Sequence, residues 1–336
     1  MILSVSKIFV RNKSFQHFKK KKELIVCIEG ELLYGIHPIR LALQANKRTI
    51  HKIFYNRNSE KPSQLAEYAQ TKNIETQMMS RFDLDELTRQ SYKYKDHHVH
   101  QGIVADVSRI YQVPVDYFMP QFPDLKFDYD QDLAGENFIL LLFDIKDPMN
   151  LGAILRSAYY FGIKKIIVAG DRIDLNGIVS KTSSGALEMI SVYAVRHTVP
   201  FLEKLQSHGW RVLALTLPNS TNDNVLPLNH VEGRNKTILI VGSEGAGIPT
   251  EVLEASDGGV FIPGVHHIEN KTKMSPDNLE EIHHKDEVDD RLKARVQDDT
   301  ESPENLEEEF DLTSASVDSL NVSVATALSI HHFLKK

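Results

Sequence analysis

Apolar positions recur at two different spacings in residues 31–107 of the chain. Three segments show helical spacing and three show short strand-like runs, in the order GIHPIRLALQA, HKIFYN, QLAEYAQTKN, IETQMM, DLDELTRQ and GIVADV. Each strand-like run thus lies between helical segments or follows one. The alternation predicts a compact α/β domain of about eighty residues.

From Phe138 onward the apolar runs are longer and the pattern becomes strand, loop, helix. FILLLFD is continuously apolar, as a parallel sheet covered on both faces requires. Four further strand-like runs follow, KIIVA, VYAV, RVLAL and TILIVG, and helices are expected near 151–161, 200–208 and 249–256. The pattern predicts a doubly wound α/β domain, in which ligands bind beyond the C-terminal ends of the strands.

Two segments lack periodicity. Residues 108–136 contain three prolines and are predicted to be a linker between the domains. Residues 265–318 hold 17 Asp/Glu against 6 Lys/Arg and are predicted to be a disordered or mobile insert. The insert has a net charge of −11, whereas the whole chain has a net charge of −7. The rest of the chain therefore has a net charge of +4, which is compatible with an RNA partner.

Residues 1–22 carry seven Lys/Arg and no acid among apolar residues, the composition of an organelle transit peptide. The open alternatives are a disordered basic segment that contacts RNA and a nuclear signal at residues 19–22. The only cysteine, Cys27, excludes an intramolecular disulfide framework and favours a reducing or organellar interior. No apolar run reaches the ~18 residues of a spanning helix, so no membrane partner is expected.

The first stretch that could carry chemistry is FDIKDPMNLGAILRSAYYFG, residues 143–162. It leads from a strand into a helix expected from about Leu151, with Asn150 near the N-cap and Arg156 about two turns along. Arg156 can direct a fork of donors at a phosphate or a developing oxyanion. An ordinary capped helix with a surface arginine explains the spacing equally well.

The second stretch, VGSEGAGIP at residues 241–249, follows a strand and places Glu244 among three glycines. Glycines let the main chain approach a ligand closely, although a plain turn is the alternative. The stretch does not match the dinucleotide fingerprint, which occurs on an early strand, so a dehydrogenase is disfavoured.

The third stretch is DGGVFIPG, residues 257–264, which continues after the acidic insert as SLNVSVATALSIHHF. This last segment has almost no polar face, so we expect a buried helix. Histidines at 97, 98 and 100 and three His-His pairs suggest metal binding, but no second cysteine is present and we expect no metal.

Together, DPMNLGAILRSA, IVGSEGAGIP, and FIP with SLNVSVATAL resemble the three ordered motifs of the SpoU family of SPOUT RNA 2'-O-ribose methyltransferases. YGIHPIRLAL and HHVHQGIVADV are similar to the ends of its N-terminal domain. The resemblance covers most of residues 31–334. It implies an L30e-like RNA substrate-binding domain over 31–107, and over 137–336 a SPOUT-type parallel sheet with a C-terminal trefoil knot, interrupted by the insert 265–318.

The resemblance also implies a site for S-adenosylmethionine. Gly242, Ile262 and Leu320 would supply main-chain contacts to this cofactor. The reaction centre would be lined by Asn150, Arg156, Glu244, Ser319 and Asn321. Because arginine keeps its proton in proteins, Arg156 is expected to stabilise charge, Glu244 to orient Asn150 or Asn321, and Ser319 and Asn321 to hold the ribose. The family is typically homodimeric, with the partner subunit completing the site.

With its basic leader, the chain most resembles the mitochondrial subgroup that methylates a guanosine of large-subunit rRNA in the peptidyl-transferase region, which implies the matrix. A tRNA or cytosolic-rRNA 2'-O-methyltransferase, and a non-catalytic rRNA-binding assembly factor, remain alternatives. Two departures stand out: 55 residues separate Pro263 from Ser319 where about six are usual, and I-P-G replaces I-P-M at Gly264. We expect the insert to project away from the RNA and to be dispensable.

Overall fold

The computed structural model describes residues 6–9, 25–91, 99–117, 127–218, 224–233, 236–264 and 319–335. It forms two compact units, Met1–Ile262 with Asn321–Lys336, and Pro263–Leu320. Both domains described below belong to the first unit. Most of the predicted leader and the whole acidic insert 265–318 lie outside the described residues, so the predictions about them stay predictions. The exception is strand β1 (Ser6–Phe9), which pairs antiparallel with β2 (Ile25–Ile28).

The N-terminal domain contains a four-stranded mixed sheet in the order β3-β6-β4-β5. Its strands are β3 (Glu31–Tyr34), β4 (Ile50–Tyr55), β5 (Glu75–Met78) and β6 (Ile103–Val107), and its helices are α1 (Ile36–Ala45), α2 (Glu60–Thr71) and α3 (Arg81–Ser91). Strand β6 is buried throughout, and its side chains alternate between two cores. Helices α1 and α2 contribute to one core and α3 to the other, which confirms the predicted α/β domain.

The C-terminal domain is built on an eight-stranded parallel sheet in the order β12-β14-β11-β13-β8-β9-β10-β7. Its strands are β7 (Val113–Pro114), β8 (Phe138–Phe143), β9 (Lys165–Ala169), β10 (Ser191–Val195), β11 (Arg211–Leu215), β12 (Val225–Pro227), β13 (Thr237–Val241) and β14 (Gly258–Phe261). The apolar run in β8 serves both faces, because Leu140 and Leu142 join one core while Ile139 and Leu141 join the other. The predicted parallel α/β fold is confirmed.

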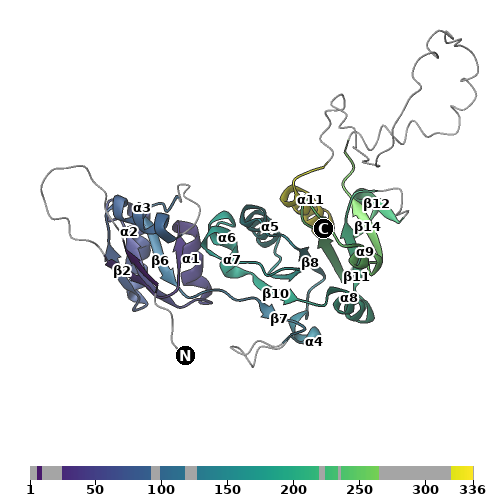
Figure 1. Cartoon of the computed structure of the whole chain (residues 1–336), viewed down its shortest axis with the longest axis horizontal. Coiled ribbons are helices and arrows are strands. Elements are labelled where there is room, and N and C mark those ends of the chain that lie inside the picture. Colours follow the sequence, from purple (N-terminus) through teal and green to yellow (C-terminus); the bar gives the residue numbers. More distant parts are fainter. Residues whose placement is uncertain are drawn as a thin grey trace, which may run out of the picture. The chain divides into compact units, whose positions relative to one another are not determined.

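Helices cover both faces of this sheet (Figure 1). They are α4 (Tyr129–Asp132), α5 (Pro148–Tyr160), α6 (Gly177–Thr182), α7 (Ala186–Met189), α8 (Thr198–Ser207), α9 (Thr250–Glu254) and α11 (Val322–Leu334), with the 3-10 turn η1 (Leu228–His230). Helices α5, α6, α7 and α11 pack into one core, and α8 and α9 into the other. No helix in the described part of the chain is long and apolar enough to cross a membrane.

The segment predicted to be a linker, 108–136, also contributes to the domain. Within it, β7 pairs in parallel with β10 and forms the edge of the sheet. Phe127 and Tyr129 pack against the core beneath α8. A two-residue strand leaves no periodic signal in a sequence, which explains why only its prolines were informative.

The expectation that the last helix is fully buried is wrong for this chain taken alone. Helix α11 packs on α5, with Val322 and Ile330 in the core. However, Val324 is 47% exposed and Leu328 is 46% exposed. An almost wholly apolar helix therefore presents one uncovered apolar face.

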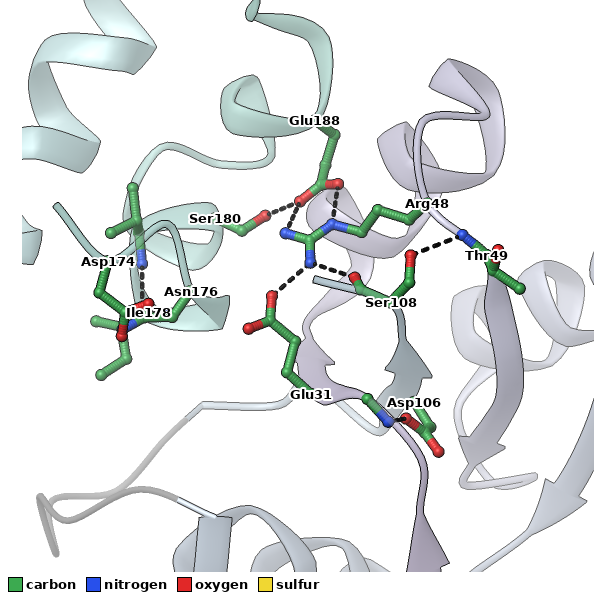
Figure 2. Close-up of polar contacts among 12 residues, drawn as sticks. Glu31, Arg48, Thr49, Asp106, Ser108, Asp174, Asn176, Ile178, Ser180 and Glu188 are labelled. Atoms are coloured by element: carbon green, nitrogen blue, oxygen red, sulfur yellow. Dashed lines mark hydrogen bonds and ion pairs between the residues drawn. The ribbon is translucent and has the colours of Figure 1, made fainter. Parts of the chain in front are cut away.

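A buried ion-pair network joins the two domains (Figure 2). The guanidinium of Arg48, which follows α1, donates two hydrogen bonds to Glu188 of α7, over 2.7 and 3.1 Å. It also pairs with Glu31 of β3 and donates to the Ser108 carbonyl. Although burial acts to lower the pKa of Arg48, the carboxylates of Glu188 and Glu31 raise it overall. The network fixes the charged guanidinium between the domains.

Candidate active site

Two loops that carry predicted site residues leave neighbouring strands at the same edge of the sheet. Strands β8 and β13 are paired in parallel, so their C-terminal ends lie together. The loop after β8 leads into α5, and the loop after β13 holds residues 242–249. In open parallel sheets this edge is where ligands bind.

The three sequence stretches meet in one hydrogen-bonded cluster. The side-chain amide of Asn321 donates to the side-chain oxygen Oδ1 of Asn150 over 3.0 Å and to a Glu244 carboxylate oxygen over 2.7 Å. These residues are 171 and 77 positions apart in the chain. The structure therefore brings together Asn150, Glu244 and Asn321, three of the five predicted reaction-centre residues.

Asn321 also begins helix α11. Its side-chain oxygen caps the helix by accepting hydrogen bonds from the amide and the hydroxyl of Ser323, over 2.9 and 2.5 Å. Both the donor and the acceptor ends of Asn321 are thus used within the chain. Asn321 positions the cluster in this arrangement, and its contact with the ribose stays a prediction.

Glu244 connects the glycine-rich turn to α11. The oxygen that accepts from Asn321 also accepts from the Val322 amide over 3.2 Å. A carboxylate at this position satisfies an unpaired helix amide and interacts favourably with the helix dipole. This agrees with the expected role of Glu244 in orienting Asn321.

The predicted helix start in the first stretch is wrong by one turn. Helix α5 begins at Pro148, and its N-cap is Asp147, whose carboxylate accepts from the main-chain N–H of Asn150 over 2.8 Å. Asn150 lies inside the first turn and is not the cap. Asp followed by Pro is a strong start signal that could have located the cap from the sequence. The side chain of Asn150 is instead bonded to Asn321.

The glycine-rich turn folds back on itself. The Gly247 amide bonds to the Ser243 carbonyl over 3.0 Å, and Gly247 has a φ of 67°. A Cβ at Gly242 would lie 2.5 Å from main-chain atoms of Gly247. Glycine at 242 is therefore required by the turn itself.

Two of the three residues predicted to contact the cofactor lie at the C-terminal edge of the sheet. Gly242 follows β13 and Ile262 follows β14, and these strands flank β11. Their main chains are thus about 10 Å apart, given the usual strand spacing. Ser319 and Leu320 belong to the second unit, so their place at the site stays a prediction.

Arg156 does not point toward the cluster formed by its own chain. Six residues separate it from Asn150 on α5, which rotates the two side chains by about 120° around the helix axis. Arg156 instead shares a face with Met149 and Tyr160, which are 58% and 83% exposed. The structure leaves its guanidinium exposed on an uncovered, largely apolar face.

The surroundings of Arg156 are basic. The pKa of the His37 imidazole on α1 is lowered by burial and by four cations, Arg40, Lys181, Lys61 and Arg156. No sequence pattern predicts this cluster, because its members come from four helices. In contrast, no group of metal-ligating side chains occurs within the described residues.

Comparison with known proteins identifies the family. The model of the SpoU rRNA Methylase family matches residues 137–270, and a model of the RNA 2'-O ribose methyltransferase substrate-binding domain matches residues 32–112. The chain belongs to the SpoU rRNA methylase family. SpoU proteins are methyltransferases whose cofactor is S-adenosylmethionine, and membership confirms the resemblance seen in the three motifs.

Individual SpoU relatives agree. The human protein "rRNA methyltransferase 1, mitochondrial" is 30% identical over 241 residues, a match that covers 68% of this chain and 64% of the human protein. The 23S rRNA (guanosine-2'-O-)-methyltransferase RlmB of Coxiella burnetii is 27% identical, over 69% of this chain and 85% of the relative. The match to the human relative thus spans just under two thirds of its length.

A solved SpoU structure shows the same fold. The methyltransferase AviRb from Streptomyces viridochromogenes, in complex with S-adenosylmethionine, superposes with a TM-score of 0.57 at 18% identity. The alignment covers 90% of this chain and 89% of that chain. The C-terminal trefoil knot expected from the SpoU resemblance stays a prediction.

Proposed function

We propose that this protein transfers a methyl group from S-adenosylmethionine to the ribose 2'-hydroxyl of a guanosine in mitochondrial large-subunit rRNA. The observation that carries the proposal is the cluster of Asn150, Glu244 and Asn321, which unites all three family motifs at the ligand-binding edge. The names of the human and Coxiella relatives supply the organelle, the type of RNA and the base.

The reaction needs help at the nucleophile, because a ribose hydroxyl is a weak one. When bound, S-adenosylmethionine supplies an electrophilic methyl group on a sulfonium. Arg156 keeps its own proton, so we assign it the stabilisation of negative charge that develops on the 2'-oxygen. The proton then passes to a phosphate oxygen or to water.

The cluster contributes position. The Asn321 amide is fully bonded to Asn150 and Glu244, which fixes the Asn150 side chain. No hydrogen bond of the Asn150 side-chain nitrogen Nδ2 occurs within the described residues, so this group is the donor left to hold the ribose. Aligning the nucleophile with the methyl group can lower the barrier by up to ~7–11 kcal/mol. Gly242, Ile262 and Leu320 would hold the cofactor with main-chain groups, and Ser319 would complete the wall.

We further propose that the protein is a homodimer through an apolar face on α5 and α11. This face comprises Met149, Tyr160, Val324 and Leu328, all large apolar side chains that are 46–83% exposed on two helices in contact. Exposed apolar patches mark interaction sites. Arg156 lies on the same face of α5, so a second copy docked there would receive this guanidinium near its own cluster.

Ribose-methylation mapping tests the proposal. Depleting the protein from cells should remove one 2'-O-methylguanosine in the peptidyl-transferase region of mitochondrial large-subunit rRNA, and re-expression should restore it. Loss of a methyl group from a tRNA or a cytosolic rRNA would replace the proposed substrate. An unchanged map with impaired ribosome assembly would favour a non-catalytic assembly factor.

A further inference from the structure

Four cations gather where the two domains meet. Arg40 of α1 and Lys61 of α2 come from the N-terminal domain, and Arg156 of α5 and Lys181 of α6 come from the C-terminal domain. We call these four residues the junction cations. All four act electrostatically on one side chain, His37, and lower its pKa. No ion pair of the four occurs within the described residues.

The N-terminal end of α1 adds to this positive charge. Its N-cap, Gly35, has no side chain to bond the first amides. Lys181 approaches this end so closely that a Cβ on Gly35 would lie 2.5 Å from its ammonium nitrogen. The Lys181 ammonium donates to Gln101 over 2.9 Å, and Gln101 also accepts from the Ile36 amide over 3.1 Å. Lys181 is thus held at a helix end of like charge by a neutral partner, which leaves its charge uncompensated.

Contacts between the two domains hold the cations of the N-terminal domain close to those of the C-terminal domain. The buried pair between Arg48 and Glu188 crosses the same junction. In addition, a Cβ on Gly185 of the C-terminal domain would lie 3.0 Å from the main chain of His37 and Pro38, so α1 packs directly on this glycine. Residues from separate domains therefore form one fixed surface.

We propose that the junction cations form a composite surface that binds the phosphate backbone of the RNA substrate and leads it from the N-terminal domain to Arg156. The inference rests on the proposed function and deepens it. Uncompensated cations near one another attract the regularly spaced phosphates of RNA. Arg156 belongs both to this surface and to the reaction, so the backbone that it contacts is adjacent to the methylated ribose.

His37 makes this surface sensitive to pH. Burial and the neighbouring cations disfavour its protonated form, so its pKa is lowered in the free protein. A bound phosphate would favour protonation and raise that pKa. Affinity for RNA should therefore rise as the pH falls and His37 becomes protonated. The substitution His37→Asn should remove that dependence.

The test compares charge reversals on one helix. Lys61 lies near the start of α2 and Lys72 at its C-cap, about 16 Å away along the axis. We expect Lys61→Glu, and Lys181→Glu in the other domain, each to weaken binding of a fluorescein-labelled large-subunit rRNA transcript at least about fivefold and to lower the salt slope by about 0.7–0.9. Lys72→Glu carries the same charge change and should bind like the wild type.

Anisotropy titrations of the full chain and steady-state methylation of the same transcript separate the two proposals. The junction variants should raise KM for RNA while kcat at saturating RNA is unchanged. If Lys61→Glu and Lys181→Glu bind RNA as tightly as Lys72→Glu does, the proposed surface is refuted, even if methylation proceeds. Absence of methylation by the wild type, with binding still weakened by the two variants, would refute the proposed function and leave the surface standing.

Discussion

Arg156→Ala should lower kcat for methyl transfer by about 10²- to 10³-fold, the cost of losing one donor that stabilises a developing oxyanion. The side chain is exposed, so the substitution should leave the fold intact. Initial rates of tritium transfer from S-adenosylmethionine at saturating RNA measure the loss, and a thermal melt checks the fold. Arg156→Lys keeps the charge without the planar fork and should recover only part of the rate. Full activity of Arg156→Ala would contradict the assigned role.

Mixing two inactive variants tests whether Arg156 serves the partner subunit. A dimer of one Arg156→Ala chain and one Glu244→Ala chain would contain one intact site if Arg156 acts across the interface, because both defects then fall in the same site and the other site has neither. We expect such mixtures to recover up to about half of the wild-type activity per mixed dimer. No recovery, with mixed dimers confirmed by mass, would place Arg156 in its own chain's site.

Arg48→Ala should destabilise the protein by about 3–5 kcal/mol, because it leaves the carboxylate of Glu188 buried without its cation. Glu188 has no exposed surface, and among the described residues only Ser180 would remain as a side-chain hydrogen-bond partner, over 2.6 Å. Urea unfolding measures the free energy. Because the junction also aligns the junction cations, affinity for RNA should fall in the same variant.

A matched double variant separates the lost charge balance from lost packing. Arg48→Met combined with Glu188→Leu removes both charges while keeping volume, and should unfold close to the wild type. Exposed Arg57 offers a control, since Arg57→Ala removes an arginine from the same domain at little expected cost. Equal stabilities for Arg48→Ala and Arg57→Ala would show that the buried network contributes nothing.

Much of the fold follows from local sequence patterns. The continuous apolar run 138–143 indicated a parallel strand, and β8 serves two cores as expected. The motifs also predicted that Asn150, Glu244 and Asn321 belong together, although they are far apart in the chain. These predictions succeeded because a buried strand and each of the three motifs are short contiguous stretches, which a sequence shows directly.

The failures have physical reasons as well. The side-chain oxygen of Asn150 could cap a helix, but Asp147 followed by a proline starts α5 one turn earlier. The apolar α11 was expected to be buried, yet its packing on α5 buries only one side of the helix and leaves Val324 and Leu328 exposed. Local patterns also cannot reveal the junction cations, because only the docking of two domains brings them together.

The most direct test of the central claim is methylation by the purified full chain. The protein, S-adenosylmethionine and a transcript of mitochondrial large-subunit rRNA are incubated together, and the RNA is digested and analysed by mass spectrometry. We predict one 2'-O-methylguanosine at a single position with the wild type, and none with Arg156→Ala. A methyl group on a base, or an RNA left unmodified although the protein binds both the cofactor and the transcript, would contradict the account.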